Sequence, residues 1–235
     1  MCHSSCIHAA SKLLSSISLL LAIVSLGILT PSTTAAQHAL SDDHDTLQAD
    51  VAHFLQVDPA LGNKPFAVLL CRFSDSTAAP QEAAFYQTAF DNTYPHIGHY
   101  WRDVSGAQLN IDGTQVYGWY TLPNRASDYF DTSTTYPTPA ERSKLWDDCT
   151  SLADPAVDYT AYYGVILVFQ DWPESKGRFG DWRQYTLDGQ TRIWGITFVS
   201  ATDFGTSLAL IKHEMGHAFN MRHSIGADGR AYISR

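Results

Sequence analysis

Glutamate, lysine and arginine are scarce in this chain of 235 residues. Only four of the 24 acidic residues are glutamate, and the 15 lysines and arginines leave a formal charge of -9. No run of basic residues occurs, so the electrostatic signature of a nucleic-acid-binding protein is missing. The shortage of glutamate and lysine also argues against a coiled coil. With 45% hydrophobic residues, the chain is still apolar enough for a sizeable globular core.

Charge is almost absent from the N-terminal region, where Lys12 is the only charged side chain in the first 41 residues. An apolar stretch from Leu13 to Leu29 is followed by Pro31 and by small residues up to Ala36. This order is typical of a secretory signal peptide, so we expect residues 1–36 to be removed and the mature protein to be secreted. A membrane anchor is the alternative, but 17 residues with four serines are short for crossing a bilayer, and we expect no stable membrane insertion after cleavage.

Cysteine is scarce as well. Two of the four cysteines lie within residues 1–36, and Cys71 and Cys149 remain in the predicted mature chain. In an oxidising compartment these two can form a disulfide, or each can be a buried free thiol, and the sequence leaves both alternatives open.

The apolar runs predict the strands of a sheet. Residues 66–73 and 164–170 are continuous apolar runs, which are typical of buried central strands. Residues 193–200 alternate in hydropathy and predict a half-exposed edge strand. Residues 108–122 also alternate, with two glycines as breaks, and predict a hairpin or two short strands.

Three segments between and after these strands have helical features: residues 80–90, 139–152 and 206–220, the last with Thr206 or Ser207 as its N-cap. Helices that alternate with strands favour an α/β (α+β) fold with a mixed, mostly parallel sheet and an antiparallel edge strand. Residues 37–63 are acidic and polar, and we expect a short leader or pro-segment there. One folded domain is then expected over residues 64–235.

The last predicted helix carries residues that fit a metal site. His213 and His217 are four residues apart, so they lie about 5–6 Å apart on one helix face and can bind one ion. Glu214 is placed to take a proton from metal-bound water without being a ligand itself. His223 reaches the same ion only if the helix ends before it, and we expect Asn220 to adopt the left-handed conformation that ends the helix.

Other interpretations of these histidines are weaker. If no metal ion bound there, burying two histidines and a glutamate beside apolar residues would cost free energy, because their polar groups would lack partners. A thermolysin-like site takes its third ligand from a glutamate further along the chain, but Glu214 is the last glutamate. An aspartate as third ligand would have to be Asp228, eleven residues past His217, and the spacing favours His223. His96 and His99 flank a turn and are expected to be surface or packing residues.

The segment from His213 to His223 reads H-E-x-x-H-x-x-N-x-x-H and resembles the zinc signature of the metzincins, in which Gly usually stands at the position of Asn220. Residues 100–105 and 108–123 are similar to secreted bacterial peptidases of the immune inhibitor A type. The pair His223–Ser224 resembles the gametolysin-like branch. The resemblance implies a zincin-like catalytic domain with an active-site helix.

The function that this resemblance implies is that of a secreted zinc metalloendopeptidase acting on proteins or peptides. Zinc would be bound by His213, His217 and His223, and Glu214 would activate the zinc-bound water. Two alternatives remain open. One is a catalytically silent zinc-binding adhesion or binding module with the same fold, and the other is a zinc hydrolase that acts on a different bond.

Two further expectations concern the surroundings of the site. If residues 193–200 are an edge strand, an extended peptide can bind antiparallel along them, with Trp194 and Thr197 beside it. Metzincin-like sites also rest on a turn with a methionine after the third histidine. The methionines here are Met1, Met215 and Met221, all before His223, so we expect the C-terminal part of the domain to be missing from the chain.

Overall fold

The structure, a computed structural model, describes residues 60–77, 81–131, 133–225 and 231–232. The predicted signal peptide and most of the predicted leader lie outside these residues, as does Asp228. Within the described part of the chain, no helix is both long and apolar enough to cross a membrane.

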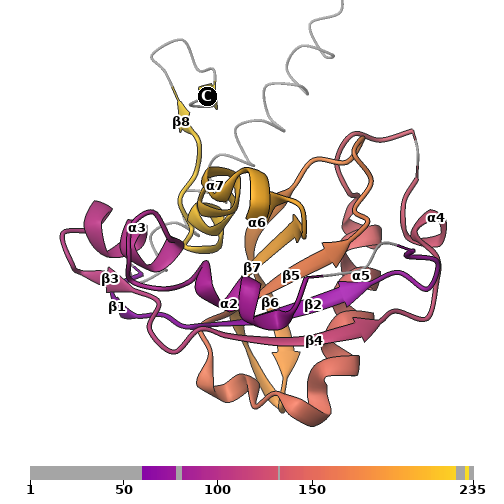
Figure 1. Cartoon of the computed structure of the whole chain (residues 1–235), viewed down its shortest axis with the longest axis horizontal. Coiled ribbons are helices and arrows are strands. Elements are labelled where there is room, and N and C mark those ends of the chain that lie inside the picture. The colour runs from indigo at the N-terminus through magenta and orange to yellow at the C-terminus, as the bar shows by residue number, and fades with distance from the viewer. Residues whose placement is uncertain (1–59, 78–80, 132, 226–230, 233–235) are drawn as a thin grey trace, which may run out of the picture. The chain divides into compact units, whose positions relative to one another are not determined.

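A five-stranded sheet in the order β4-β2-β5-β7-β6 forms the centre of the fold (Figure 1). Strands β4, β2, β5 and β7 are parallel to one another, whereas the last strand, β6, runs antiparallel to β7. Their bounds are β2 Phe66–Arg72, β4 Gln115–Thr121, β5 Gly164–Gln170, β6 Phe179–Leu187 and β7 Gln190–Ser200. The prediction of a mixed α/β fold with a mostly parallel sheet is therefore confirmed.

Six helices and four short strands complete the described part of the fold. The helices are α2 Ala83–Thr88, α3 Ile97–Val104, α4 Ala126–Tyr129, α5 Pro139–Ala153, α6 Asp203–Thr206 and α7 Leu208–Ala218, with 3-10 turns at Asp154–Ala156 and Tyr159–Ala161. Two further sheets have two strands each: β1 Gly62–Asn63 with β3 Leu109–Asn110, and β8 Ser224–Ile225 with β9 Ala231–Tyr232.

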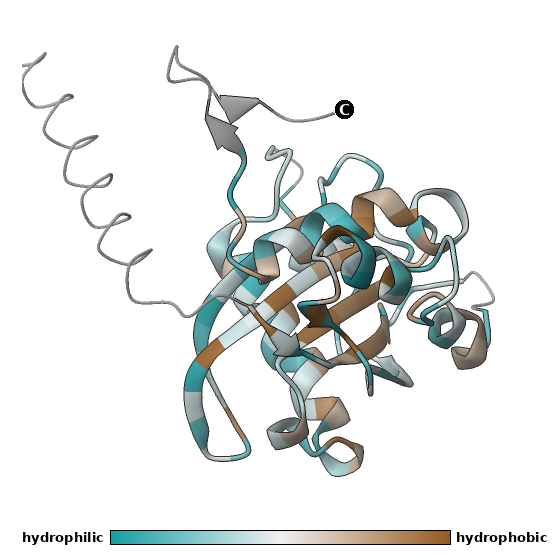
Figure 2. Ribbon diagram, turned by 90° about the vertical axis from the view of Figure 1, so that its left-hand side faces the viewer, coloured by the Kyte–Doolittle hydropathy of each residue, from teal (hydrophilic) through white to brown (hydrophobic). Residues whose placement is uncertain are grey.

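Buried side chains cover both faces of the sheet. Leu69 and Leu167 belong to a core shared with α5, whereas Val68 and Ile166 belong to a core shared with α2, α3 and α7. Successive strand residues point to opposite faces, so β2 and β5 contribute to both cores and have continuously apolar sequences. Hydrophobic residues accordingly concentrate on the central strands (Figure 2).

A disulfide links the sheet to α5. Cys71 in β2 and Cys149 in α5 are fully buried and bonded, with their Cα atoms 6.3 Å apart. The structure thereby decides between the two alternatives that the sequence left open. The bond closes a loop with a sequence separation of 78 residues, and it fixes α5 on the sheet face opposite α7.

Two strand predictions need correction. Residues 193–200 form the C-terminal part of β7, but β7 pairs with β5 on one side and with β6 on the other, so it is not an edge strand. The antiparallel edge strand is β6, whose sequence mixes charged and aromatic residues and was not predicted. For residues 108–122 the alternative of two separate strands is confirmed and the hairpin is wrong, because β3 pairs with β1 and β4 pairs with β2.

Candidate metal centre

Helix α7 carries the first two predicted ligands on the side that faces away from the sheet. Ile211 and Met215 are fully buried in the core against the sheet. His213 comes two residues after Ile211, and His217 two residues after Met215, which is a rotation of about 200° around the helix. Both histidines are half-buried and line a cleft. Ser207 occupies the predicted N-cap position, although its side chain makes no capping hydrogen bond.

The end of α7 is where the sequence predicted it. The N–H of Asn220 donates to the His217 carbonyl and the N–H of Met221 donates to the Gly216 carbonyl, both at 2.8 Å. Asn220 has φ 62°, so the helix closes with a Schellman motif around a left-handed residue. This turn reverses the chain and brings His223 back to the helix face that carries His213 and His217.

The three histidines converge on one point. The Nε2 atoms of His213 and His217 are 3.3 Å apart, and each lies 3.1 Å from Nε2 of His223. Nitrogen ligands about 2.0–2.1 Å from a tetrahedral metal ion are about 3.3–3.4 Å apart, so the triangle has the size that one such ion needs. The histidine cluster can therefore hold a metal ion with three nitrogen ligands.

A hydrogen bond of His217 and the surroundings of His213 favour metal binding. Nδ1 of His217 lies 2.6 Å from the carbonyl oxygen of Met221, so Nδ1 donates its proton there and Nε2 keeps its lone pair for the shared centre. Burial, together with the neighbouring His217 and His223, lowers the pKa of His213. A neutral imidazole is the form that binds metal.

Glu214 lies beside the histidines and lines the same cleft. Only 8% of its surface is exposed, and this burial raises the pKa of its carboxyl group to about 7. A backbone hydrogen bond from Gly180 and the charge of Arg178 act in the opposite direction, and Asp203 adds to the rise. A carboxyl group with a pKa near neutrality can both accept and return a proton at physiological pH.

The cleft in front of the histidines is large and mainly apolar. It has a volume of about 980 Å³, and its walls come from α3, α7, the start of β6 and the loop before α5. In Figure 1, α3 lies to the left of α7, and α4, which precedes the loop before α5, lies to the right. The lining residues are Tyr100, Tyr136, Gly177, Arg178, Phe179, Gly180, Ala209, Leu210, His213, Glu214, His217 and His223.

The predicted substrate-binding residues Trp194 and Thr197 do not line this cleft, and both are completely buried. Trp194 belongs to the core on the α5 face of the sheet, away from the histidines, and its Nε1 donates to the carbonyl of Tyr185. Thr197 lies in the middle of β7, between two paired strands. The prediction that they flank a bound peptide is wrong, because it depended on β7 being an edge strand.

The two histidines that were not expected to be ligands lie away from the metal-binding cluster. His96 lies directly before α3 and His99 lies within it, and both are absent from the cleft lining and from the metal-binding cluster. Tyr136, Gly177 and Phe179 line the cleft but were not predicted, because only the contact between distant segments brings them to the histidines.

Comparison of the sequence with models of protein families and with curated proteins finds no match. The assignment of a function therefore depends on the residues of the site.

Proposed function

We propose that this protein is a secreted zinc-dependent endopeptidase with a zincin-like, metzincin-type catalytic domain. The observation that carries the proposal is the meeting of three Nε2 atoms within 3.3 Å of one another, beside the buried carboxyl group of Glu214 in an open cleft. The H-E-x-x-H-x-x-N-x-x-H pattern supports it, because each of its four functional positions contributes to that arrangement.

Zinc is the metal that suits this donor set best. Three imidazole nitrogens without a thiolate are typical of catalytic zinc sites, which keep a fourth position for water or substrate. Structural zinc sites instead have four protein ligands, usually with cysteine, and both described cysteines are tied up in the disulfide.

The chain's own residues supply binding and proton transfer. When bound, zinc lowers the pKa of a water molecule and polarises the scissile carbonyl group. Glu214 accepts the proton of the attacking water and passes it to the nitrogen of the leaving amine. Arg178 donates to both carboxylate oxygens of Asp203, at 2.6 and 3.0 Å, and so holds the chain before β6 against the segment that precedes α7.

Strand β6 is the element along which we propose that the peptide binds. Its outer side has no strand partner in the described sheet, and Phe179 and Gly180 at its start line the cleft. An extended substrate can add to such an edge through backbone hydrogen bonds. This replaces the earlier assignment of the substrate to residues 193–200.

The decisive experiment compares the wild-type chain with Glu214→Gln. We expect the purified wild type to contain one zinc per chain and to cleave gelatin or casein in a chelator-sensitive manner. Glu214→Gln should retain zinc but lose at least about 100-fold in activity, because only the general base is removed. Full zinc occupancy without cleavage in the wild type would favour the catalytically silent binding module. Chelator-sensitive cleavage of small esters but not of proteins would favour the other zinc hydrolase.

A further inference from the structure

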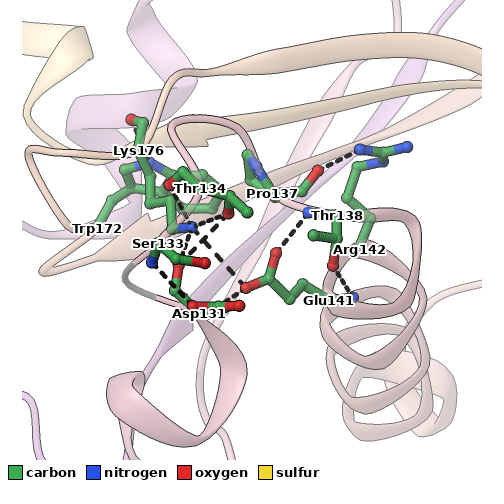
Figure 3. A network of polar contacts seen from close by, with 9 residues as sticks. All are labelled: Asp131, Ser133, Thr134, Pro137, Thr138, Glu141, Arg142, Trp172 and Lys176. Carbon is green, nitrogen blue, oxygen red and sulfur yellow. Dashed lines mark hydrogen bonds and ion pairs between the residues drawn. The ribbon is translucent and has the colours of Figure 1, made fainter.

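A buried lysine anchors the loop between α4 and α5. Lys176 is only 2% exposed, and its Nζ donates to the Asp131 carbonyl at 2.5 Å, the Thr134 carbonyl at 2.7 Å and the Thr134 hydroxyl at 2.6 Å (Figure 3). The carboxylate of Glu141 lies 3.9 Å away and compensates the charge. Because all three N–H groups have acceptors, the buried charge is fully satisfied and acts as a fixed attachment point.

Helix α5 holds the other side of the same loop. The carboxylate of Glu141 accepts hydrogen bonds from the backbone N–H groups of Asp131 and Thr138, and Arg142 donates to the carbonyl of Pro137 (Figure 3). Hydrogen bonds to charged groups are about twice as strong as neutral ones. The loop is thus attached at both ends, from α5 and from Lys176.

Tyr136 is the residue that this loop presents to the cleft. It is 60% exposed, although it lines the cleft that contains the histidines. Its ring packs so closely on Gly177 that a Cβ atom there would overlap it, and the N–H of Gly177 donates to the Thr135 carbonyl at 2.9 Å. Gly177 directly follows Lys176, so one segment both anchors the loop and supports the ring.

The described lining of the cleft offers no free cationic side chain to a substrate, and its one carboxyl group, Glu214, is the proposed general base. Arg178 is the only lysine or arginine among its described lining residues, and Asp203 already pairs with it. The lining of the same cleft also includes the apolar side chains of Phe179 from β6 and Leu210 from α7. Such a surface favours an uncharged, apolar ligand group and disfavours a charged one, which would lose its hydration without compensation.

We propose that Tyr136 is a specificity-determining residue, and that its ring, which packs on Gly177, selects peptides with an aromatic or large aliphatic side chain next to the scissile bond. The proposal rests on the proposed endopeptidase function and assigns a substrate class to it. Aromatic pairs gain free energy beyond the burial of their area, and one apolar group in such a pocket commonly changes specificity by about tenfold or more.

Two zinc-binding probes test this without requiring turnover: a dipeptide hydroxamate with phenylalanine and its counterpart with alanine. Calorimetry with the zinc-loaded full chain should give at least about tenfold tighter binding of the phenylalanine compound. Tyr136→Ser should reduce this ratio to near one with unchanged zinc content, whereas Tyr136→Phe should retain it. Tyr94→Ser, which alters an 82% exposed tyrosine outside the cleft, is the matched control and should keep the wild-type ratio.

The possible failures are distinguishable. An unchanged ratio in Tyr136→Ser, or equal binding of both compounds by the wild type, would overturn the role of Tyr136 whether or not the protein cleaves peptides. Chelator-insensitive activity, or full activity in Glu214→Gln, would instead overturn the proposed function. A peptide library cleaved by the wild type should show the same aromatic or aliphatic preference, and a preference for charged residues would contradict the proposal.

Discussion

Gly180 in β6 packs directly on the backbone of Glu214 in α7, and a Cβ atom at position 180 would overlap the carbonyl oxygen of Glu214. This close approach lets a backbone group of Gly180 hydrogen-bond to the carboxyl group of Glu214. Only glycine allows a strand to lie so near a helix. The proposed substrate-binding strand and the proposed general base are therefore set in position by one contact.

Gly180→Ala should damage this contact. The added methyl group forces β6 and α7 apart, which should lower the unfolding free energy by about 1–3 kcal/mol and reduce peptide hydrolysis at least about tenfold. Zinc content should change little, because the atoms nearest to this Cβ position belong to Glu214 and not to a histidine. Gly205→Ala is the matched control, since nothing lies within 4 Å of the Cβ position of Gly205. Wild-type stability and activity in Gly180→Ala would show that the two elements can separate without consequence.

His217→Ala should lose both zinc and activity. The substitution removes one of three ligands and also the hydrogen bond to the Met221 carbonyl that orients the loop before His223. His99→Ala serves as the comparison, because His99 is half-buried but lies outside the metal-binding cluster. Metal analysis after dialysis should give one zinc per chain for His99→Ala and little for His217→Ala. Equal zinc content in the two variants would remove His217 from the ligand set.

The parts of the fold that could be predicted are those with local signals. β2 and β5 are covered on both faces and therefore have continuous apolar sequences, and the spacing of His213 and His217 specifies one helix face. The left-handed conformation of Asn220 also follows from a local preference, and the structure confirms it.

The parts that could not be predicted depend on contacts between distant segments. β6 has a half-exposed, partly charged sequence because it lies at the edge of the sheet, so no apolar pattern marks it. Because the sequence does not reveal β6, residues 193–200 have the pattern of an edge strand. Trp194 and Thr197 were therefore assigned to the wrong surface. Lys176 binds a loop more than 40 residues earlier in the chain, and no sequence pattern reveals a contact of that kind.

The network around Glu141 should make the stability of the protein depend on pH. Burial alone would raise the pKa of Glu141, but hydrogen bonds from the Asp131 and Thr138 backbone and the charge of Lys176 outweigh it, so the pKa lies below its ordinary value. Such a carboxylate stabilises the fold at pH values above its unfolded pKa, and this contribution is lost as the pH falls through the lower, folded pKa. Glu141→Gln should therefore be less stable than the wild type at pH 7 by about 1–3 kcal/mol.

The pH profile separates this effect from a general loss of packing. In urea unfolding of the zinc-free proteins, the difference between Glu141→Gln and the wild type should narrow as the pH falls below 4.5, the ordinary pKa of the group. Glu174→Gln, at an exposed position, should match the wild type throughout. A difference that stays constant from pH 7 to low pH would mean that the ionised carboxylate is not what stabilises the loop.

Asn220 provides a test of the turn that returns His223 to the helix. With φ 62°, its backbone suits glycine better than any other residue, and its buried Oδ1 has no hydrogen-bond partner in the described part of the chain. Asn220→Gly should therefore be tolerated or slightly stabilising. Asn220→Val should be harmful, because a β-branched residue at positive φ costs about 1–3 kcal/mol.

The cost in Asn220→Val should appear in metal binding. If the turn relaxes, Nε2 of His223 leaves its position 3.1 Å from the other two nitrogens, and the protein must recover that position to bind zinc. A cost of about 1–3 kcal/mol corresponds to a zinc Kd raised by about five- to 150-fold, measured by competition with a chelator of known affinity. Asn220→Gly should bind zinc at least as tightly as the wild type under the same conditions. Equal zinc affinity in the valine and glycine variants would show that the left-handed turn does not hold His223 in place.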